Sequence, residues 1–331
     1  MRSLRLLLLL VLSLGIGVGL KFYWDYRELH PTTDDAYVQA HIVDIAARVS
    51  GPVVAVHVAE NDYVEAGAAL FDIDPSVFQA TVDSADANYE MAAQDTGADD
   101  AEVGVARSNV TEREVTLARA RRNLERATAL GESNLISEAE YDNAKATFAE
   151  VTAALESARA DLRRAQSKLG VKGAQNARQR AAQAALTAAQ LELSFTRVVA
   201  PVAGWVSNIS LREGAMIIAE RSQFSIVEDK HWWVEANFKE TDLHHIRPGQ
   251  MAVIKLDMYP DLELTGAVES LGAGSGAVFS LLPPENATGN WVKVTQRFPI
   301  RISIDPRVDD LANERPLRVG ASATVAVNLD Q

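Results

Sequence analysis

Two short motifs in this sequence contain residue types that metal or phosphate chemistry uses. His244 and His245 are adjacent. Neighbouring side chains on a strand point to opposite faces, so two such histidines cannot easily share one metal ion. Gly272, Gly274 and Gly276 form a glycine-rich loop, but no Lys followed by Ser or Thr comes after it, as a P-loop requires. We therefore interpret both histidines as surface or loop residues and the glycines as an ordinary loop.

The charged residues form no catalytic constellation. Asp34 with Asp35, and Asp99 with Asp100, are most simply solvated charges, because nothing in the sequence indicates a shared proton. The formal net charge is −13 and the chain has no cysteine. These facts oppose a nucleic-acid surface and exclude disulfides and thiolate metal sites. We expect no enzyme activity, no catalytic, cofactor-binding or metal site, and no nucleic-acid partner.

Two Ala-rich heptad runs dominate the middle of the chain. In each run apolar residues recur alternately three and four positions apart, the spacing of a coiled-coil seam. If the chain folds back near Glu132 and Ser133, a large side chain meets a small one in nearly every layer, as interior packing requires. The layers are Ala127 with Tyr141, Leu124 with Ala144, Ala120 with Phe148, Leu117 with Val151, Val110 with Ala158, Ala106 with Leu162, and Val103 with Ala165.

This pattern predicts an antiparallel helical hairpin over residues 76–194, with arms at 76–130 and 137–194 that are about 80 Å long. Two amphipathic helices of a soluble bundle are the alternative. The pattern breaks at 96–100 and at 170–173, which predicts a matched flexible joint on the two arms. Beyond it we expect Phe78, Val82, Ala85, Tyr89 and Ala92 to face Ala177, Ala181, Ala184, Ala188 and Leu191.

The N-terminus has the composition of a membrane anchor. Arg2 and Arg5 precede an unbroken apolar stretch at residues 6–20, which Lys21 and the aromatic triplet 22–24 follow. The apolar core is short for a span of about 20 residues, and a cleaved signal peptide is the alternative. No small-x-small cleavage site follows it, however, and the aromatic triplet is typical of a membrane interface. We expect a cytoplasmic N-terminus at 1–5, a transmembrane anchor at 6–24 in contact with lipid, and the rest of the chain beyond that membrane.

Two β-rich segments with the same spacing of apolar and glycine residues flank the hairpin. The aligned pairs are Gly51 with Gly204, Val53 with Val206, Val56 with Ile209, Val58 with Leu211, and Glu60 with Glu213. In each segment alternating apolar residues are followed by a glycine, Gly67 or Gly214, which indicates half-buried strands ended by turns. We assign turn roles to Gly51, Gly67, Gly204 and Gly214, and expect residues 46–75 and 195–229 to form one small β-module.

The two segments resemble the halves of a lipoyl or biotinyl carrier domain, which interlock into a flattened β-sandwich. A carrier displays a lysine on the turn between its halves, but this chain has no lysine between Lys21 and Lys145. We therefore expect no lipoyl or biotin cofactor and disfavour a carrier-domain enzyme subunit. The module is expected to support the base of the hairpin.

An anchor, a split lipoyl-like module and a coiled-coil hairpin together resemble the HlyD/EmrA branch of the membrane fusion proteins, the periplasmic adaptors of bacterial tripartite efflux pumps. Three strings support the resemblance: DDAYV at 34–38, WVEANFKETDL at 233–243, and FSLLPPENATGNWVKVTQRFPIRI at 279–302. With the strand-like alternation at 232–269 and 291–305, the resemblance implies a small β-barrel over 230–305. Its candidate positions at a transporter or self-assembly interface are Asn237, Phe238, Lys239, Glu240, Asn286 and Asn290.

A final alternating strand at 321–329 could pair with residues 35–45. We expect a separate membrane-proximal β domain built from 34–45 and 306–331. The predicted fold class is therefore an elongated α+β chain: anchor, split lipoyl-like sandwich, hairpin, β-barrel and membrane-proximal domain.

At the hairpin tip the family carries a motif of Arg, three residues, Leu, six residues and Ser, which engages a TolC-like outer-membrane channel. Arg126, Leu130 and Ser137 stand at that spacing, on either side of the fold-back point. Leu130 could enter an apolar groove and Arg126 could donate to carboxylates or carbonyls, while Ser137 could bond across or cap the returning helix with Glu140 in a capping box. A purely local role, with Ser137 as N-cap and Arg126 solvated, is the alternative.

The resemblance implies a periplasmic adaptor of a multidrug or small-molecule efflux system, anchored in the bacterial inner membrane by a single pass. Its expected partners are a proton-driven major-facilitator transporter, a TolC-like channel and further copies of itself, as a trimer or hexamer. An adaptor for an ABC exporter or a type I secretion system is the second interpretation. A coiled-coil envelope protein without a transport role is a third.

Overall fold

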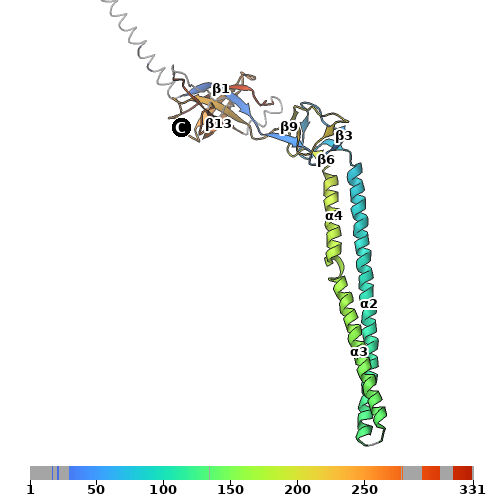
Figure 1. Cartoon of the computed structure of the whole chain (residues 1–331). Helices are drawn as coiled ribbons and strands as arrows, with labels where there is room; N and C mark the ends of the chain where they lie inside the picture. Colours follow the sequence, from blue (N-terminus) through green and yellow to red (C-terminus); the bar gives the residue numbers. More distant parts are fainter. Residues whose placement is uncertain are drawn as a thin grey trace, which may run out of the picture.

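The computed structural model describes residues 30–133, 135–276, 278, 293–305 and 316–329, together with Gly17 and Lys21. The molecule is elongated: a closed β-barrel is followed by a small unit of two β-sheets, from which a long helical hairpin projects (Figure 1). The predicted anchor at 6–24 falls outside the described residues, except for Gly17 and Lys21. No helix in the described part of the chain combines the length and apolarity that crossing a membrane requires.

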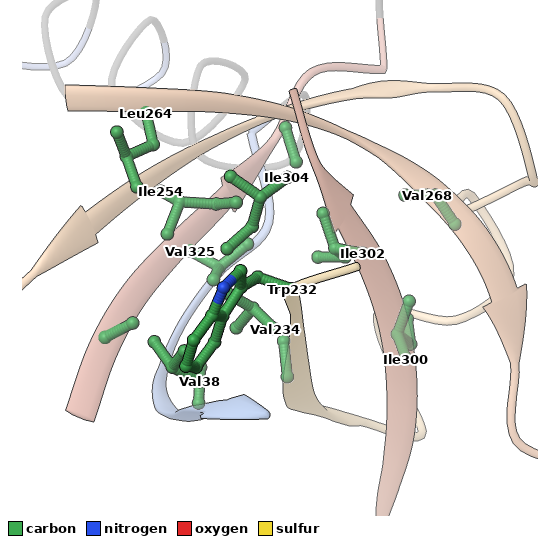
Figure 2. Close-up of a cluster of buried hydrophobic side chains, with 14 of the residues drawn as sticks. Val38, Trp232, Val234, Ile254, Leu264, Val268, Ile300, Ile302, Ile304 and Val325 are labelled. Atoms are coloured by element: carbon green, nitrogen blue, oxygen red, sulfur yellow. The ribbon is translucent and has the colours of Figure 1, made fainter. Parts of the chain in front are cut away.

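Antiparallel strands close the barrel in the order β1, β10, β13, β12, β11, β14. Their bounds are Thr32–Gln39, Trp233–Lys239, Arg297–Ile304, Glu263–Leu271, Met251–Leu256 and Ser322–Val327. Because side chains alternate along each strand, one apolar set points inward. The indole of Trp232 lies among Val38, Val234 and Val325 in this core (Figure 2).

The first and last strands of the described chain complete this barrel. The predicted pairing of the two is confirmed, since Thr32 lies opposite Ala326 and Tyr37 opposite Ser322. The expectation of a separate membrane-proximal domain is wrong for the described residues, because β1 and β14 also pair with β10 and β11 of the barrel. Both strands have a buried apolar face that the barrel interior accommodates. Residues 306–315 lie outside the described part.

The second unit consists of two facing sheets, which we call the split β-module. One sheet has the order β2, β9, β7, β4 and the other β6, β5, β3, β8. The bounds are β2 Ile42–Ala46, β3 Gly51–Val56, β4 Tyr63–Val64, β5 Ala69–Ile73, β6 Arg197–Val199, β7 Gly204–Ser207, β8 Met216–Ile217 and β9 Ser222–Glu228. The module therefore begins at Ile42, a few residues before the predicted boundary.

The predicted internal repeat is present in the backbone. The shift that takes Gly51 to Gly204 also takes β4 onto β8 and β5 onto β9. Equivalent hydrogen bonds recur: Gly67 N donates to Ala200 O at 2.8 Å, and Glu220 N donates to Ala47 O at 2.8 Å. Gly67 and Glu220, with φ of 86° and 66°, are thus equivalent turn residues.

This equivalence corrects two details of the predicted turns. Gly214, with φ of 81°, corresponds to Asn61, with φ of 67°, rather than to Gly67. Gly51 and Gly204 are not turn residues, because they begin β3 and β7. They are needed for close approach: a Cβ on Gly204 would lie 2.0 Å from the carbonyl oxygen of Val227.

The hairpin leaves and re-enters the split β-module on adjacent strands. Helix α2 spans Ser76–Glu132 directly after β5, and the return arm consists of α3 (Glu138–Leu169), the short 3₁₀ helix η1 (Gly173–Gln175) and α4 (Ala177–Ser194), just before β6. Strands β5 and β6 are hydrogen-bonded neighbours, with Phe71 opposite Val198. The two ends of the hairpin are thereby held side by side.

The distal seam agrees with the predicted layers. Val103 and Ala165 share a buried cluster with Ala106 and Leu162 packed against it. A second cluster joins Val110 with Leu155 and Ala158. The fold-back point is also as predicted, since α2 ends at Glu132.

The matched joint is only half right, because α2 continues through residues 96–100 without a break. Thr96 and Asp99 occupy the buried seam positions between Ala92 and Val103, so polar residues replace apolar ones while the heptad spacing continues. The Thr96 hydroxyl is satisfied by the carbonyl of Ala92 at 2.7 Å. Only the return arm is interrupted among the described residues, at 170–176.

The predicted seam on α4 is wrong. Leu186 and Ala189 are the buried residues of this helix, whereas the predicted seam residue Leu191 is 54% exposed. Ala177, Ala181, Ala184 and Ala188 are exposed as well. Because alanine occurs on several faces of α4, the apolar pattern alone does not identify the face that packs on α2.

Candidate docking site at the hairpin tip

A short connection joins the two arms at the tip (Figure 1). Helix α2 ends in a tightened turn: Ser133 N and Leu135 N both donate to Leu130 O, at 3.2 and 2.9 Å. These bonds satisfy a carbonyl that the end of the helix would otherwise leave unpaired. Asn134 lies outside the described residues. The tip is therefore compact, with defined backbone on both sides of the turn.

Ser137 begins the return arm as its N-cap. Its hydroxyl accepts from Glu140 N at 3.3 Å, and a carboxylate oxygen of Glu140 accepts from Ser137 N at 3.0 Å, the predicted capping box. The Ser137 hydroxyl is also 3.0 Å from the same carboxylate oxygen and can donate to it. The backbone N–H of Ser137 lowers the pKa of Glu140, with a further contribution from the hydroxyl. Ser137 thus has a clear local role.

Two exposed leucines give the tip an apolar surface. Leu130 is 42% exposed on the last turn of α2, and Leu135 is 70% exposed in the connection. The sequence prediction named Leu130 but missed Leu135, which lies outside the heptad pattern and the family motif. Ile136, the residue after Leu135, is partly buried, and its side chain lies near Gly131. Exposed apolar side chains at the end of a long arm are accessible to a partner.

Arg126 lies one turn before Leu130 on the same helix and is exposed. Its guanidinium donates to the side-chain oxygen of Asn123 on the same helix. Arg126, Leu130 and Ser137 therefore all lie at the tip, with the first two on α2 and the third across the turn. The arrangement can offer hydrogen-bond donors beside an apolar contact, which suits a protein interface rather than catalysis.

The predicted interface positions on the barrel divide into buried and exposed groups. Phe238 is 0% exposed, so it packs the barrel core and cannot contact a partner. The Asn237 amide donates to Asp35 at 3.2 Å, and Arg297 forms an ion pair with Asp35 at 3.2 Å. Asp35 is therefore not a freely solvated charge. Lys239 and Glu240 lie at the end of β10 with more exposed side chains, and Asn286 and Asn290 fall outside the described residues.

His244 and His245 lie in an exposed turn after β10, which confirms the prediction that they are surface or loop residues. Because they are in a turn, their side chains do not point to opposite faces: the ring centroids are 3.7 Å apart. Even so, the described part of the chain contains no group of three or more His, Asp or Glu residues that could hold a metal ion.

Comparison with known proteins agrees with this architecture. Residues 41–229 match the family model described as the RND MFP barrel-sandwich hybrid domain, and residues 231–328 match the AAEA-like beta-barrel domain. The fold thus defines a membrane fusion protein with a split β-module, a hairpin and a barrel. The chain belongs to the membrane fusion protein family, in the group of EmrA-type export adaptors.

The chain aligns with most of the length of several relatives. The multidrug export protein EmrA of Escherichia coli is 34% identical over 89% of this chain and 76% of its own length. The colistin resistance protein EmrA of Acinetobacter baumannii is 32% identical over 88% of this chain and 86% of its own. The structure of the periplasmic adaptor protein EmrA aligns with 91% of this chain and 99% of its own, at 19% identity and a TM-score of 0.45.

Proposed function

We propose that this chain is the periplasmic adaptor of a tripartite efflux system for drugs or other small molecules. The observation that carries the proposal is the long hairpin, which emerges from adjacent strands of the split β-module and exposes Leu130 and Leu135 at its far end (Figure 1). Such an arm can connect two proteins that lie far apart, and family membership supports an adaptor role without catalysis.

In this proposal the tip docks on a TolC-like outer-membrane channel. Leu130 enters an apolar groove between channel helices, and Arg126 donates to carboxylates or carbonyls there. Ser137 holds the turn through its capping box and is the third element of the motif. The exposure of Leu130 and Arg126 supports these roles.

The inner-membrane partner is a proton-driven major-facilitator transporter, beside which residues 6–24 anchor the chain as a single pass with the N-terminus in the cytoplasm. An ABC exporter or a type I secretion system is the alternative partner. Lys239 and Glu240, on the barrel, are candidate contacts with the transporter or with another copy. Several copies, as a trimer or hexamer, are required because one hairpin cannot enclose a conduit.

The cargo is not specified by the adaptor. Relatives of similar identity are named for multidrug export, for colistin resistance and, in Neisseria gonorrhoeae, for fatty acid resistance at 34% identity over 89% of this chain. One scaffold thus accompanies several substrate classes, and we assign selectivity to the transporter.

Affinity purification of the full chain in mild detergent, followed by mass spectrometry, tests the proposal. We expect a major-facilitator transporter to co-purify; an ABC exporter in its place would select the alternative. Recovery of neither transporter class from membranes that contain them would reject the adaptor role.

A further inference from the structure

The interruption of the return arm is surrounded by charges that tie it to α2. Gly170 and Gly173 both have φ of 69°, so the chain leaves the helical conformation there, and α3 and α4 are separate helices. Lys168 is in the last turn of α3 and Arg178 in the first turn of α4. Opposite them, the Asp99 carboxylate binds Lys168 Nζ at 2.9 Å and Arg178 at 2.9 Å.

We propose that this interruption is a locked joint and that Asp99 is its lock: one buried carboxylate on the unbroken helix holds both halves of the broken arm. This inference concerns the arm itself and goes beyond the proposed docking of its tip.

The environment of Asp99 supports a specific role. Its side chain is only 8% exposed, while those of Lys168 and Arg178 are each 52% exposed. A buried carboxylate must be paired, whereas the two cations can return to water when they lose it. Glu102 also binds Lys168, at 2.8 Å, and Asp100 pairs with Lys172. These outer pairs lie beside Asp99, but Glu102 reaches only α3 and Asp100 reaches only Lys172 within the interruption, so neither connects α3 with α4.

Asn176 makes the interruption itself a defined structure. It is 5% exposed, donates to Leu169 O at 2.7 Å and Val171 O at 3.0 Å, and accepts from Arg178 N at 2.9 Å as the N-cap of α4. The end of α3 and the start of α4 are therefore joined through one side chain. Asn176 does not fix the orientation of α3 and α4 relative to α2. In this proposal, Asp99 fixes that orientation through its ion pairs with Lys168 and Arg178.

The angle matters because the joint lies far from the tip. About 33 residues separate Asp99 from the C-terminal end of α2, or about 50 Å at the helical rise. If the whole arm bent by about 10° at the level of Asp99, the tip would move by about 9 Å. By fixing this angle, Asp99 would hold the tip in one position relative to the split β-module.

Distances between spin labels test the lock directly, because the chain contains no native cysteine. Cysteines at the exposed positions Arg163 and Gln183 place one label on each side of the interruption, about 30 Å apart along the arm. A second pair, at Glu150 and Arg163, lies within α3 and reports on helix integrity. The full chain is measured in detergent by double electron–electron resonance.

We expect a narrow distance distribution in the wild type and at least a twofold broader one in Asp99→Asn. Asp95→Asn, which changes an exposed carboxylate one turn away on α2, should leave it narrow. Arg178→Gln and Lys168→Gln each remove one side of the lock and should broaden it too. If the control pair shows that Asp99→Asn has unfolded α3, the distance distributions of Arg178→Gln and Lys168→Gln test the proposal in its place. A broad wild-type distribution, or narrow distributions in the folded variants, would overturn the proposal.

Discussion

The rings of Phe71 and Phe224 meet edge to face at the centre of the split β-module, with centroids 6.1 Å apart and planes inclined at 66°. The two residues occupy equivalent positions in β5 and β9, one before the hairpin and one after it. This aromatic contact joins the two halves of the repeat, which the inserted hairpin separates in the sequence.

We expect Phe71→Ala and Phe224→Ala to destabilise this module by a similar amount, about 3–5 kcal/mol each, because both rings are almost fully buried. Hydrogen exchange of the β5 and β9 amides as a function of urea measures the loss. Met216→Ala, at a residue that is 73% exposed in the same module, should change stability by less than about 0.5 kcal/mol. Equal effects of the core and surface substitutions would contradict this packing.

Leu130→Glu should abolish docking of the tip without unfolding the arm. An apolar contact at the centre of an interface is worth about 2 kcal/mol or more, so channel affinity should fall at least about 30-fold. Drug export in cells and crosslinking from a single introduced cysteine at Ser133 measure the effect. Val115→Glu is the matched control, since Val115 is 58% exposed on the same helix but far from the tip. Normal export by the Leu130 variant would remove Leu130 from the interface.

Substitutions of Ser137 separate capping from docking. Ser137→Ala should fray the start of α3 and cost about 1 kcal/mol, which circular dichroism and hydrogen exchange can follow. Ser137→Asp keeps a capping acceptor but has no hydroxyl, so we expect normal helix content and retained export. If Ser137→Asp keeps its helix and loses export, the hydroxyl itself contacts the channel.

The joint should keep its geometry across neutral pH. Hydrogen bonding to Lys168 lowers the pKa of Asp99 below its ordinary value of 3.8, so the stabilisation is present above that value and is lost as pH falls through the lowered pKa. Hydrogen bonding to Glu102 first, and then to Asp99, raises the pKa of Lys168 to about 12. The stabilisation from Lys168 is therefore complete below 10.5 and is lost as pH rises through about 12.

The spin-label distribution across the joint should accordingly be constant from about pH 5 to about pH 9 and broaden only at the extremes. A transition near neutral pH would mean that a group other than Asp99 and Lys168 controls the angle.

The distal hairpin could be predicted because its layers alternate large and small residues over a long run. Ala106 with Leu162 and Val110 with Ala158 have few other possible partners, so the seam identifies its own register. The pattern was less informative where polar residues lie on the seam. Thr96 and Asp99 look like a break in a hydrophobic pattern, yet a helix that is already supported on both sides tolerates them when each has a partner.

The membership of β1 and β14 in the barrel and part of the tip could not be predicted from sequence patterns, for different reasons. Strands β1 and β14 are separated by nearly the whole chain, so their alternation indicates a strand without indicating which sheet it joins. Phe238 fits an apolar alternation, and only the closed barrel shows that it faces inward. Leu135 stands alone in a connection, where no periodicity marks it.

The hydrogen-bonded strands β5 and β6 hold the two ends of the hairpin side by side. The split β-module therefore meets the hairpin at the same two points, however long the arm is. Matched heptads can be removed from or added to α2 and α3 without changing where the chain re-enters the module. The length of the arm can therefore change independently of the module that carries it.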